Sequence, residues 1–475
     1  MENRQSKYTN TFCAISSPQG NGAIAVIRIN GDEAYDAADK IFYPVVNTRS
    51  LSELKPKQAY FGQVKEDEKI IDEVLLMIYQ SPHSYTGDNM VEIFCHGSHF
   101  VQRKILQMLI DMGVRIAQPG EFTMRAFQNG KMDLAQAEGV ADLIASNSEA
   151  SHKLAMQQMR GGFSDEIKKL REKLLNFISL IELELDFSEE DVEFADRSQL
   201  KSLLEEINSL IEKLMNSFEL GNAIKNGYPV AIAGNTNVGK STLLNRLLNE
   251  EKAIVTDIAG TTRDVIEDVI NIRGMEFRFI DTAGIRDTAD KIESIGIERT
   301  FTKIDKAKIV LLVVDSTQDA DYITQTIKKV EQRIQGKNIN LIVLMNKVDQ
   351  ISSEEKLRNT ENLIKEILKT DDEVLRISAK TGKNTEKLIE TLLEKANFSK
   401  LQENDILVTN TRHYEALRRA HESLQRAREG METGLPTDLL AMDVRDVIHY
   451  LGEITGDIST DEILGNIFEN FCIGK

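Results

Sequence analysis

Residues 234–241, Gly-Asn-Thr-Asn-Val-Gly-Lys-Ser, follow an apolar run and precede a helix-forming run. They match the pattern G-x-x-x-x-G-K-[ST], in which glycines allow backbone N–H groups to curl around phosphates at a helix N-terminus. Lys240 would neutralise the β- and γ-phosphates, and the Ser241 hydroxyl would bind Mg²⁺. The residues expected to contact the nucleotide here are Asn237, Val238, Gly239, Lys240, Ser241 and Thr242.

Three further segments each follow an apolar run typical of a buried strand, at 281–284, 346–349 and 378–380. The first, Asp-Thr-Ala-Gly, can reach the magnesium shell and the γ-phosphate. The carboxylate of Asp349 in the second can accept from the ring N–H and exocyclic amine of guanine, a donor pattern that adenine lacks. The third would close over the base, so the segments together predict a GTP site. The residues predicted to line it are Asp281, Thr282, Ala283, Gly284, Asn346, Lys347, Asp349, Ser378, Ala379 and Lys380.

Residues 256–264 lie between the first and second of these motifs. We expect a mobile loop ordered by nucleotide, in which Thr262 senses the γ-phosphate and Mg²⁺. Ile285 follows Gly284, where Ras-type GTPases carry a glutamine that orients the attacking water. Isoleucine cannot form that hydrogen bond, so another group and another positive charge are needed. Spacing alone leaves these candidates open as catalysts or as solvated surface residues: Glu293, Asp287, Arg286 and Arg263.

The apolar patterning predicts a multidomain α/β chain whose middle is a doubly wound sheet. Residues 1–130 mix short β-type runs with glycine and proline turns, which indicates a small α+β domain. Residues 131–226 and 396–475 carry apolar residues at steps of three and four, which is typical of helices. In 227–395 strands alternate with amphipathic helices. The simplest topology inserts this Ras-like P-loop domain into a helical domain, whose two halves pack together to cover their apolar stripes.

The helical stripes predict three long helices. The first two are joined by an acidic stretch at 189–193, which is interpreted as a solvated connection rather than a metal site. Thr437 is the expected N-cap of the third helix. The stripe residues are Phe163, Ile167, Leu170, Leu174, Ile178, Ile181 and Leu185 in the first, Leu200, Leu204, Ile207, Ile211 and Leu214 in the second, and Leu440, Val444, Val447 and Leu451 in the third.

Composition narrows the class of protein. The chain has 475 residues and a net charge of −18, so a tRNA partner would need a local basic patch or a second protein rather than bulk attraction. The first residues lack the apolar region of a secretory signal, and no apolar run is long enough to cross a bilayer. Three cysteines, Cys13, Cys95 and Cys472, imply no disulfide framework. We expect a protein of the reducing cytoplasm.

Several segments resemble one known family. Residues 134–138 (Leu-Ala-Gln-Ala-Glu) and 471–475 (Phe-Cys-Ile-Gly-Lys) are the most specific, and 119–122 (Pro-Gly-Glu-Phe) and 254–264 add to them. With the nucleotide motifs, the chain resembles the bacterial MnmE (TrmE) family of tRNA modification GTPases from end to end. Thr236 stands where that family usually has proline, which alters loop stiffness but removes no ligand.

The resemblance implies a K⁺-dependent GTPase. In that family the GTPase domains of a homodimer meet when K⁺ is bound, and the ion replaces an arginine finger where negative charge grows. The resemblance assigns the water-orienting carboxylate to Glu293, acting through a second water. It assigns the K⁺ ligands to Asn237, Thr256, Ile258 and Thr261.

The resemblance also implies a one-carbon tetrahydrofolate site in the N-terminal domain, at a dimer interface. A carboxylate can pair with the pterin edge and cations with the glutamate tail. From the residues alone, Arg28 is equally a charge on an edge strand. Cys472 is either a reactive thiol near the folate or a buried structural cysteine, and the terminal sequence is not a prenylation signal. The implied folate residues are Arg28, Glu92, Lys131 and Lys475.

The resemblance implies a role in modifying the wobble uridine of tRNAs. With an FAD- and NADH-dependent partner of the MnmG (GidA) family, in a heterotetramer, the chain would add an aminomethyl or carboxymethylaminomethyl group at carbon 5. Folate would supply the carbon, and GTP hydrolysis would act as a conformational switch. Two alternatives are a regulatory GTPase of ribosome assembly and a folate-dependent transferase with a vestigial GTPase.

Overall fold

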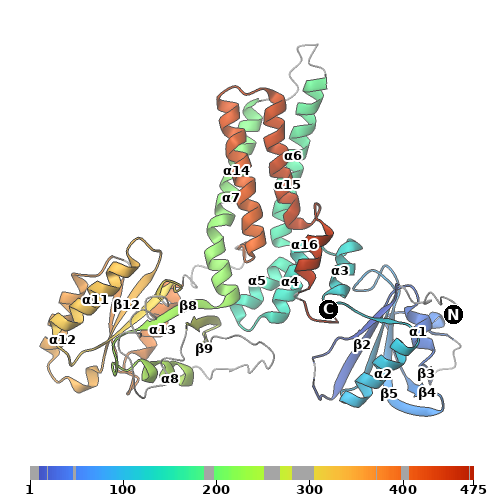
Figure 1. The fold of residues 1–475 in the computed structure, drawn as a ribbon, viewed down its shortest axis with the longest axis horizontal. Helices are drawn as coiled ribbons and strands as arrows, with labels where there is room; N and C mark the ends of the chain where they lie inside the picture. Colours follow the sequence, from blue (N-terminus) through green and yellow to red (C-terminus); the bar gives the residue numbers. More distant parts are fainter. Residues whose placement is uncertain are drawn as a thin grey trace. The chain divides into compact units, whose positions relative to one another are not determined.

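The structure is a computed structural model with two compact units. One unit comprises Met1–Ile144, Met156–Ile207 and Arg419–Lys475, and the other comprises Ala145–Ala155 and Asn208–Arg418. Figure 1 shows the course of the chain. The residues that the structure describes are 10–18, 20–45, 50–186, 197–250, 268–280, 304–370, 372–396, 406–469 and 471–474.

The first unit contains a seven-stranded sheet in the order β3-β4-β5-β6-β2-β1-β7. Neighbouring strands are antiparallel, except that β7 runs parallel to β1. The prediction of mixed strands and helices in this part of the chain is therefore confirmed. The strands are β1 Phe12–Ile15, β2 Ile24–Asn30, β3 Phe42–Pro44, β4 Ala59–Glu66, β5 Lys69–Tyr79, β6 Met90–His96 and β7 Arg115–Ile116.

One face of this sheet packs on two helices, α1 (Ala34–Asp39) and α2 (His99–Asp111). Ile27 and Ile29 of β2 belong to the core on that face, together with side chains of both helices. Successive side chains of a strand point to opposite faces, so Arg28 projects from the face opposite this core. The alternation along β2 therefore places Arg28 on the face away from the apolar core of α1 and α2.

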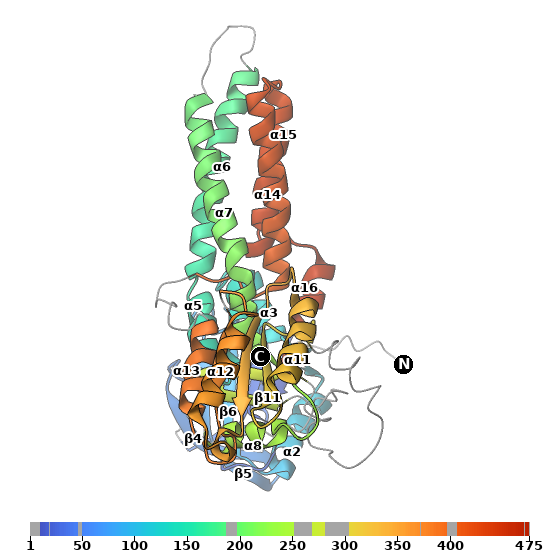
Figure 2. The same cartoon turned by 90° about the vertical axis from the view of Figure 1, so that its left-hand side faces the viewer.

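The helices of the first unit bury the predicted stripes. Helices α6 (Gly162–Asp186) and α15 (Thr437–Thr455) lie side by side in both views, with the start of α7 (Arg197–Asn226) and the end of α14 (Thr411–Glu432) (Figures 1 and 2). The burial of the stripe residues confirms the 3.6-residue periodicity in the described positions. These are Phe163, Ile167, Leu170, Leu174, Ile178, Leu204, Ile207, Leu440, Val444, Val447 and Leu451.

The expected N-cap of α15 is wrong by one position. The helix begins at Thr437, and Pro436 occupies the cap position with φ −54° and ψ 145°. The ring of proline fixes φ near about −65°, which is compatible with this extended cap position. The acidic stretch at 189–193 lies outside the described residues. The other helices of this unit are α3 Glu121–Gln128, α4 Leu134–Ala145 and α16 Asp461–Phe468.

The second unit contains a six-stranded sheet in the order β13-β12-β11-β8-β10-β9, parallel except for β9. Consecutive residues of a central strand alternate between two cores: Leu311 and Val313 belong to one, Val310 and Leu312 to the other. Both faces are thus covered, which explains why these strands are continuous apolar runs. The strands are β8 Tyr228–Ala233, β9 Asp268–Ile272, β10 Met275–Phe279, β11 Ile309–Asp315, β12 Asn340–Asn346 and β13 Glu373–Arg376.

Helices cover each face of this sheet. The core on one face includes side chains of α8 and α13, and the core on the other includes side chains of α11 and α12. The doubly wound α/β prediction is confirmed, whereas the division of the chain into four segments stays a prediction. The helix bounds are α8 Lys240–Glu250, α11 Ala320–Ile334, α12 Glu354–Lys365 and α13 Thr385–Lys395.

The turn between β9 and β10 packs on α5 (Glu149–Met159), whose first residues belong to the same unit. Ala150 N donates to Gly274 O at 3.0 Å, and Asn271 Nδ2 donates to Asn147 O at 3.4 Å. Gly274 has φ +86° and approaches Glu149, so a side chain there would be strained. In the part of the chain that the structure describes, no helix is long and apolar enough to cross a membrane.

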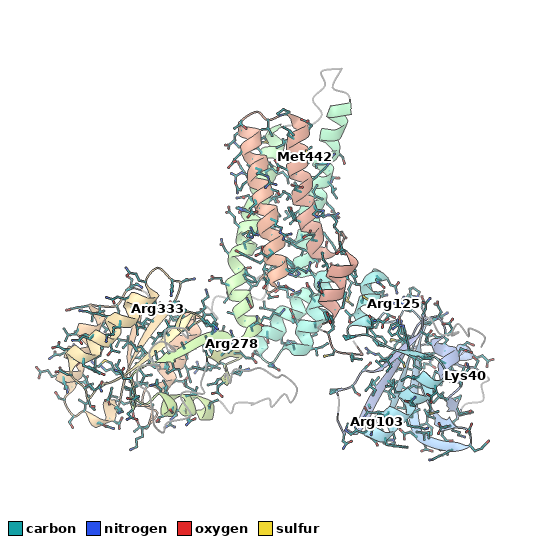
Figure 3. All side chains as sticks on the ribbon, in the orientation of Figure 1. Lys40, Arg103, Arg125, Arg278, Arg333 and Met442 are labelled. Carbon is teal, nitrogen blue, oxygen red and sulfur yellow. The ribbon has the colours of Figure 1, made fainter. Side chains whose placement is uncertain are left out.

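Neighbouring leucines on α15 give a matched test of this packing. Leu440 is 1% exposed and Leu439 is 45% exposed, and Met442 farther along the helix is also exposed (Figure 3). Leu440→Ala should lower the free energy of unfolding by about 2–5 kcal/mol, because it leaves a cavity. Leu439→Ala should change it by only about 0.5 kcal/mol. Urea unfolding followed by far-UV circular dichroism measures both, and equal losses would contradict the packing described.

Candidate functional site

The loop between β8 and α8 approaches its neighbours so closely that two positions accept only glycine. Gly234 has φ +140°, and a Cβ there would lie 2.3 Å from the carbonyl oxygen of Val313. Gly239 has φ +104°, and a Cβ there would lie 2.3 Å from Nδ2 of Asn346. Both positions combine a positive φ with a clash, which at Gly234 involves the backbone and at Gly239 could be relieved only by moving the buried Asn346 side chain. The close approach of neighbouring groups and the positive φ therefore explain why the motif has glycine at these two positions.

Lys240 lies inside the curl of this loop. Its Nζ donates to the carbonyl oxygens of Gly234 and Asn235, at 2.8 and 2.6 Å. Asn237 has φ 61°, which continues the curl, and α8 begins at Lys240 itself. The ammonium and the N-terminal N–H groups of α8 place positive charge at one spot, which suits a phosphate chain. Ser241 and Thr242 follow in the first turn of the helix.

Asn346 joins two of the predicted segments. At the end of β12 its side chain is almost fully buried, with Nδ2 donating to Val238 O at 2.8 Å and Oδ1 accepting from Ala379 N at 2.9 Å. The amide therefore connects the 234–241 loop with the 378–380 loop and satisfies one group on each. An unsatisfied buried amide or carbonyl costs about 1–3 kcal/mol, so this arrangement is strongly specified.

Lys347 is positioned by a carboxylate that the sequence reasoning missed. Its Nζ lies 2.7 Å from Oδ2 of Asp315, which ends β11, and Thr317 donates to Oδ1 through its N–H and its hydroxyl at 3.0 and 2.7 Å. Burial alone would raise the pKa of Asp315, but the hydrogen bonds from Lys347 and Thr317 lower it overall. Asp315 therefore stays ionised and holds Lys347 at neutral pH. The signal was available, because a lone aspartate ends a wholly apolar strand beside the one carrying Asn346.

The remaining described nucleotide residues lie at the same strand edge. Asp349 is exposed in a short 3-10 helix, Val348–Gln350, and Lys380 is also exposed. Ser378 is fully buried, and its Oγ accepts from Thr381 N at 3.2 Å, which shapes the loop. The structure thus brings together the three described motifs, with the exposed carboxylate of Asp349 and the ammonium of Lys240 among them.

Part of the predicted site lies outside the described residues. This part includes the assigned water-orienting carboxylate, most K⁺ ligands, one Mg²⁺ ligand and the C-terminal folate residue. Their roles stay predictions. The residues concerned are Thr256, Ile258, Thr261, Thr262, Arg263, Asp281, Thr282, Ala283, Gly284, Ile285, Arg286, Asp287, Glu293 and Lys475.

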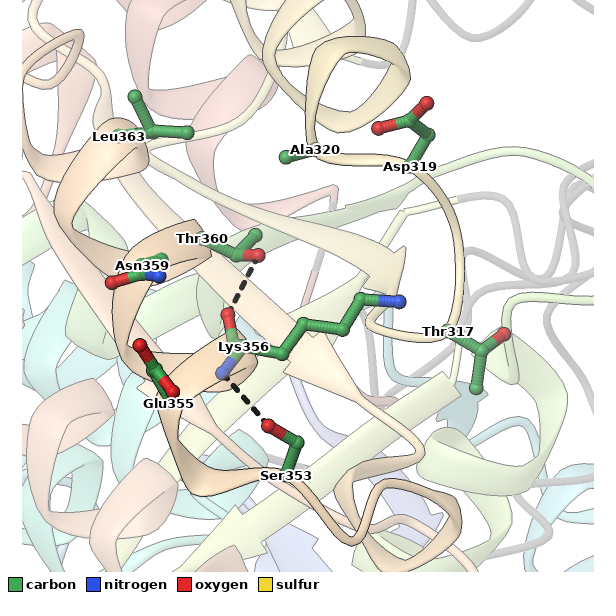
Figure 4. A pocket seen from close by; sticks show the side chains of 9 residues that line it. All are labelled: Thr317, Asp319, Ala320, Ser353, Glu355, Lys356, Asn359, Thr360 and Leu363. Atoms are coloured by element: carbon green, nitrogen blue, oxygen red, sulfur yellow. Dashed lines mark hydrogen bonds between the residues drawn. The ribbon is translucent and has the colours of Figure 1, made fainter.

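A pocket of about 620 Å³ lies between α11 and α12 (Figure 4). Thr317 is shared between this pocket and the Asp315 cluster, but none of the predicted nucleotide residues lines it. The pocket is therefore separate from the strand edge where the motifs meet. Its lining residues are Thr317, Asp319, Ala320, Ser353, Glu355, Lys356, Asn359, Thr360 and Leu363.

In the other unit, Arg28 and Glu92 form an ion pair on the sheet face opposite the core of α1 and α2. They are register partners on β2 and β6, and Nε of Arg28 donates to Oε1 of Glu92 at 2.7 Å. Tyr79 donates to the other carboxylate oxygen at 3.0 Å. Burial, and then the charge of Glu92, raise the pKa of Tyr79 to about 12, so its hydroxyl remains a donor. Two predicted folate residues are thereby in direct contact.

The C-terminal segment reaches this ion pair. The carbonyl oxygen of Gly474 accepts from Ser16 Oγ at 3.0 Å and from Nη1 of Arg28 at 3.5 Å. Gly474 has φ +92°, and a Cβ there would lie 2.5 Å from the carbonyl oxygen of Ile15. Cys472 is exposed, so the alternative of a buried structural cysteine is wrong.

Lys131 is not brought to the pair. It is exposed, and its Nζ donates to Pro82 O at 2.9 Å; in the described part of the chain no hydrogen bond joins it to Arg28 or Glu92. The sequence reasoning missed the aromatic side chains beside Arg28, whose guanidinium carbon lies 5.7 and 5.9 Å from the ring centres of Tyr85 and Phe122. Phe122 belongs to the 119–122 segment, which was a usable signal.

Comparison with known proteins decides the family. Residues 134–472 match the family described as the MnmE helical domain, and residues 11–131 match the GTP-binding protein TrmE N-terminus. The tRNA modification GTPase MnmE of Bacteroides thetaiotaomicron is 54% identical over 98% of this chain and 99% of that protein. The chain belongs to the MnmE family. The relative from Flavobacterium psychrophilum, with the same description, is 51% identical over 98% of this chain and all of that protein.

Solved structures add less. The structure of an Aquifex aeolicus Era variant bound to GDP and AlF4⁻ is 28% identical over 41% of this chain and 65% of that chain, with a TM-score of 0.28. That score is below the level at which a common fold can be argued. Membership of the MnmE family therefore rests on the two sequence comparisons, which span the sheet of the first unit, the helices and the GTPase motifs.

Two glycines with similar backbones test the nucleotide loop. Gly239→Ala would introduce both left-handed strain and a clash with Asn346, whereas Gly336, at φ +77°, has nothing within 4 Å of an added Cβ. Gly336→Ala should cost about 1–2 kcal/mol of stability from strain alone and leave nucleotide affinity unchanged. Gly239→Ala should reduce GDP affinity at least about 100-fold, because Asn346 must move away from both loops. Isothermal titration measures this, and wild-type affinity in Gly239→Ala would refute the geometry.

Proposed function

We propose that this chain is a K⁺-dependent GTPase that acts in tRNA wobble-uridine modification. The observation that carries the proposal is the side chain of Asn346, which holds the phosphate loop and the base loop at one strand edge. A ligand with a phosphate chain and a base a short distance apart would use both loops together. Family membership supports GTP as that ligand, since the relatives are described as tRNA modification GTPases.

The described residues divide the work of binding GTP. Lys240 exchanges its contacts with loop carbonyls for the β- and γ-phosphates, and the N-terminal N–H groups of α8 bind the phosphate oxygens. Lys347, held by Asp315, flanks the base, and Asp349 accepts from the guanine N–H groups. Ser241 and Thr262, the latter outside the described residues, are the proposed Mg²⁺ ligands, and the ion would offset the phosphate charge.

Hydrolysis needs a positive charge and an oriented water. We assign the positive charge to K⁺ held by Asn237, Thr256, Ile258 and Thr261, which offsets the negative charge that develops on the phosphates. Glu293 orients the water through a second water. Asn237 lies in the described 234–241 loop with a left-handed backbone and an exposed side chain, so it is open to an ion there.

The ion pair of Arg28 and Glu92 supports a folate site in the same chain. Glu92 is buried, accepts from Arg28 and Tyr79, and can pair with the N–H edge of a pterin. Tyr85, half-buried beside Arg28, offers an aromatic face to a planar ring, whereas Phe122 is fully buried and packs against the guanidinium. Gly474, which precedes Lys475 in the sequence, contacts this cluster. We assign the folate to Arg28, Glu92, Lys131 and Lys475, with Cys472 as a further candidate.

The proposed reaction uses both the GTP site and the folate site. A one-carbon tetrahydrofolate supplies the carbon for an aminomethyl or carboxymethylaminomethyl group at carbon 5 of the wobble uridine, with an FAD- and NADH-dependent MnmG-like partner in a heterotetramer. GTP hydrolysis switches the conformation of a homodimer in the cytoplasm. We propose four functional segments: 1–130 for folate and dimerisation, 227–395 for GTP, and 131–226 with 396–475 as the helical domain.

The cation dependence is the direct test of the GTPase assignment. Replacing NaCl by KCl at constant ionic strength should raise the rate of phosphate release at saturating GTP at least about tenfold, because the ion stabilises transition-state charge. Glu293→Ala should abolish this rate while leaving GTP affinity within about twofold, since the water is not part of the ground-state contacts. Equal rates in the two salts would contradict the role of K⁺, and turnover in Glu293→Ala would contradict the role of the carboxylate.

Two glutamates of the same sheet test the folate assignment. Glu92→Gln keeps the shape but removes the charge that pairs with Arg28, and should weaken tetrahydrofolate binding about tenfold or more. Glu73 on β5 is exposed and contacts Gln63, so Glu73→Gln should bind as the unchanged protein does. Anaerobic isothermal titration distinguishes the two variants. Equal tetrahydrofolate affinities of Glu92→Gln and Glu73→Gln would contradict the assignment of Glu92 to the folate site.

A further inference from the structure

Arg246 connects the helix of the phosphate loop with the loop that closes over the base. It lies on α8, and its Nη2 donates to the carbonyl oxygen of Lys380 at 2.9 Å. Its Nε donates to the carbonyl oxygen of Ala379 at 3.5 Å. The guanidinium is a planar fork of donors, so it can hold two successive carbonyls in one orientation. None of the nucleotide motifs includes this residue.

The peptide groups of Ala379 are consequently held on both sides. Its N–H donates to Asn346, and its carbonyl accepts from Arg246. The loop also bonds within itself, with Ser378 N donating to Lys383 O at 3.1 Å and Gly382 N donating to Ser378 O at 2.9 Å. These inner bonds set the shape of the loop. The side chains of Asn346 and Arg246 fix the position of the 378–380 loop relative to β12 and α8.

The same helix therefore carries contacts to both loops of the proposed GTP site. Lys240 begins α8 at the phosphate loop, and Arg246 extends from α8 to the base loop. The helix is rigid over this short distance, so the spacing between phosphate contacts and base loop is held at a constant value. A loop released from this contact samples open positions, and a base beneath an open loop dissociates sooner.

We propose that Arg246 is a positioning residue that sets how long a guanine nucleotide stays bound, by holding the 378–380 loop over the base. The inference rests on the proposed GTP site. Arg246 touches loop carbonyls rather than the reacting phosphates, so it affects nucleotide release and not the hydrolysis step. Release and turnover at saturation are therefore expected to separate in its variants.

The test uses the full chain loaded with a fluorescent GDP analogue and chased with excess GDP. Arg246→Ala should release the analogue about tenfold faster than the unchanged protein, since two charge-assisted hydrogen bonds are lost. Arg246→Lys, which reaches one carbonyl but cannot form the fork, should lie between the two. Arg358→Ala, an exposed arginine on α12, is the matched control and should release at the unchanged rate. The turnover number at saturating GTP should stay within about twofold in all four proteins.

The outcomes are distinct. Equal release from Arg246→Ala and Arg358→Ala overturns the proposal, and so does an equal fall of turnover and affinity in Arg246→Ala. If the nucleotide-free Arg246→Ala variant has a lowered melting temperature, Arg246→Lys is used for the test instead. A release rate in Arg246→Lys equal to that of the unchanged protein then overturns the proposal. If the unchanged protein fails to bind the GDP analogue at all, the GTP site itself is contradicted, which is a different result.

Discussion

The nucleotide site depends on one buried amide. The side chain of Asn346 donates to Val238 and accepts from Ala379, so it links two loops that are far apart in the chain. Buried, it cannot exchange these partners for water without loss, and each partner would be left unsatisfied. Gly239 is a consequence of this contact, because a side chain there would occupy the position of Nδ2. The residues of these motifs therefore depend on one another for their positions and do not act independently.

The strand order explains why this contact can form. Parallel strands β8, β11 and β12 are neighbours, so their carboxyl ends place Gly234, Asp315 and Asn346 at one edge. Both faces of the sheet are covered by helices, which leaves this edge as the place where polar groups can meet a ligand. Asp315 shows the balance of forces there: burial opposes its charge, yet Lys347 and Thr317 lower its pKa and keep it ionised.

The first unit uses the same principle at its own charged cluster. Glu92 is buried, and Arg28 and Tyr79 satisfy its two oxygens. The carbonyl of Gly474 accepts from Arg28 and Ser16, which closes a contact between the two ends of the described chain. A backbone with positive φ is needed for this approach, so the glycine near the C-terminus is tied to the sheet that it meets. The sheet and the C-terminal segment therefore share one charged cluster.

The sequence by itself determined the elements and the chemistry of the nucleotide motifs, because periodicity and glycine spacing are local properties. It also indicated the helical stripes, whose described members are buried. Tertiary structure decided which distant groups meet: Asp315 with Lys347, Arg246 with the 378–380 loop, and Gly474 with Arg28. It separated Lys131 from Arg28 and Glu92 and moved the cap of α15 to Pro436. Such partners follow from strand order and side-chain direction, and neither is encoded in the spacing of a short motif.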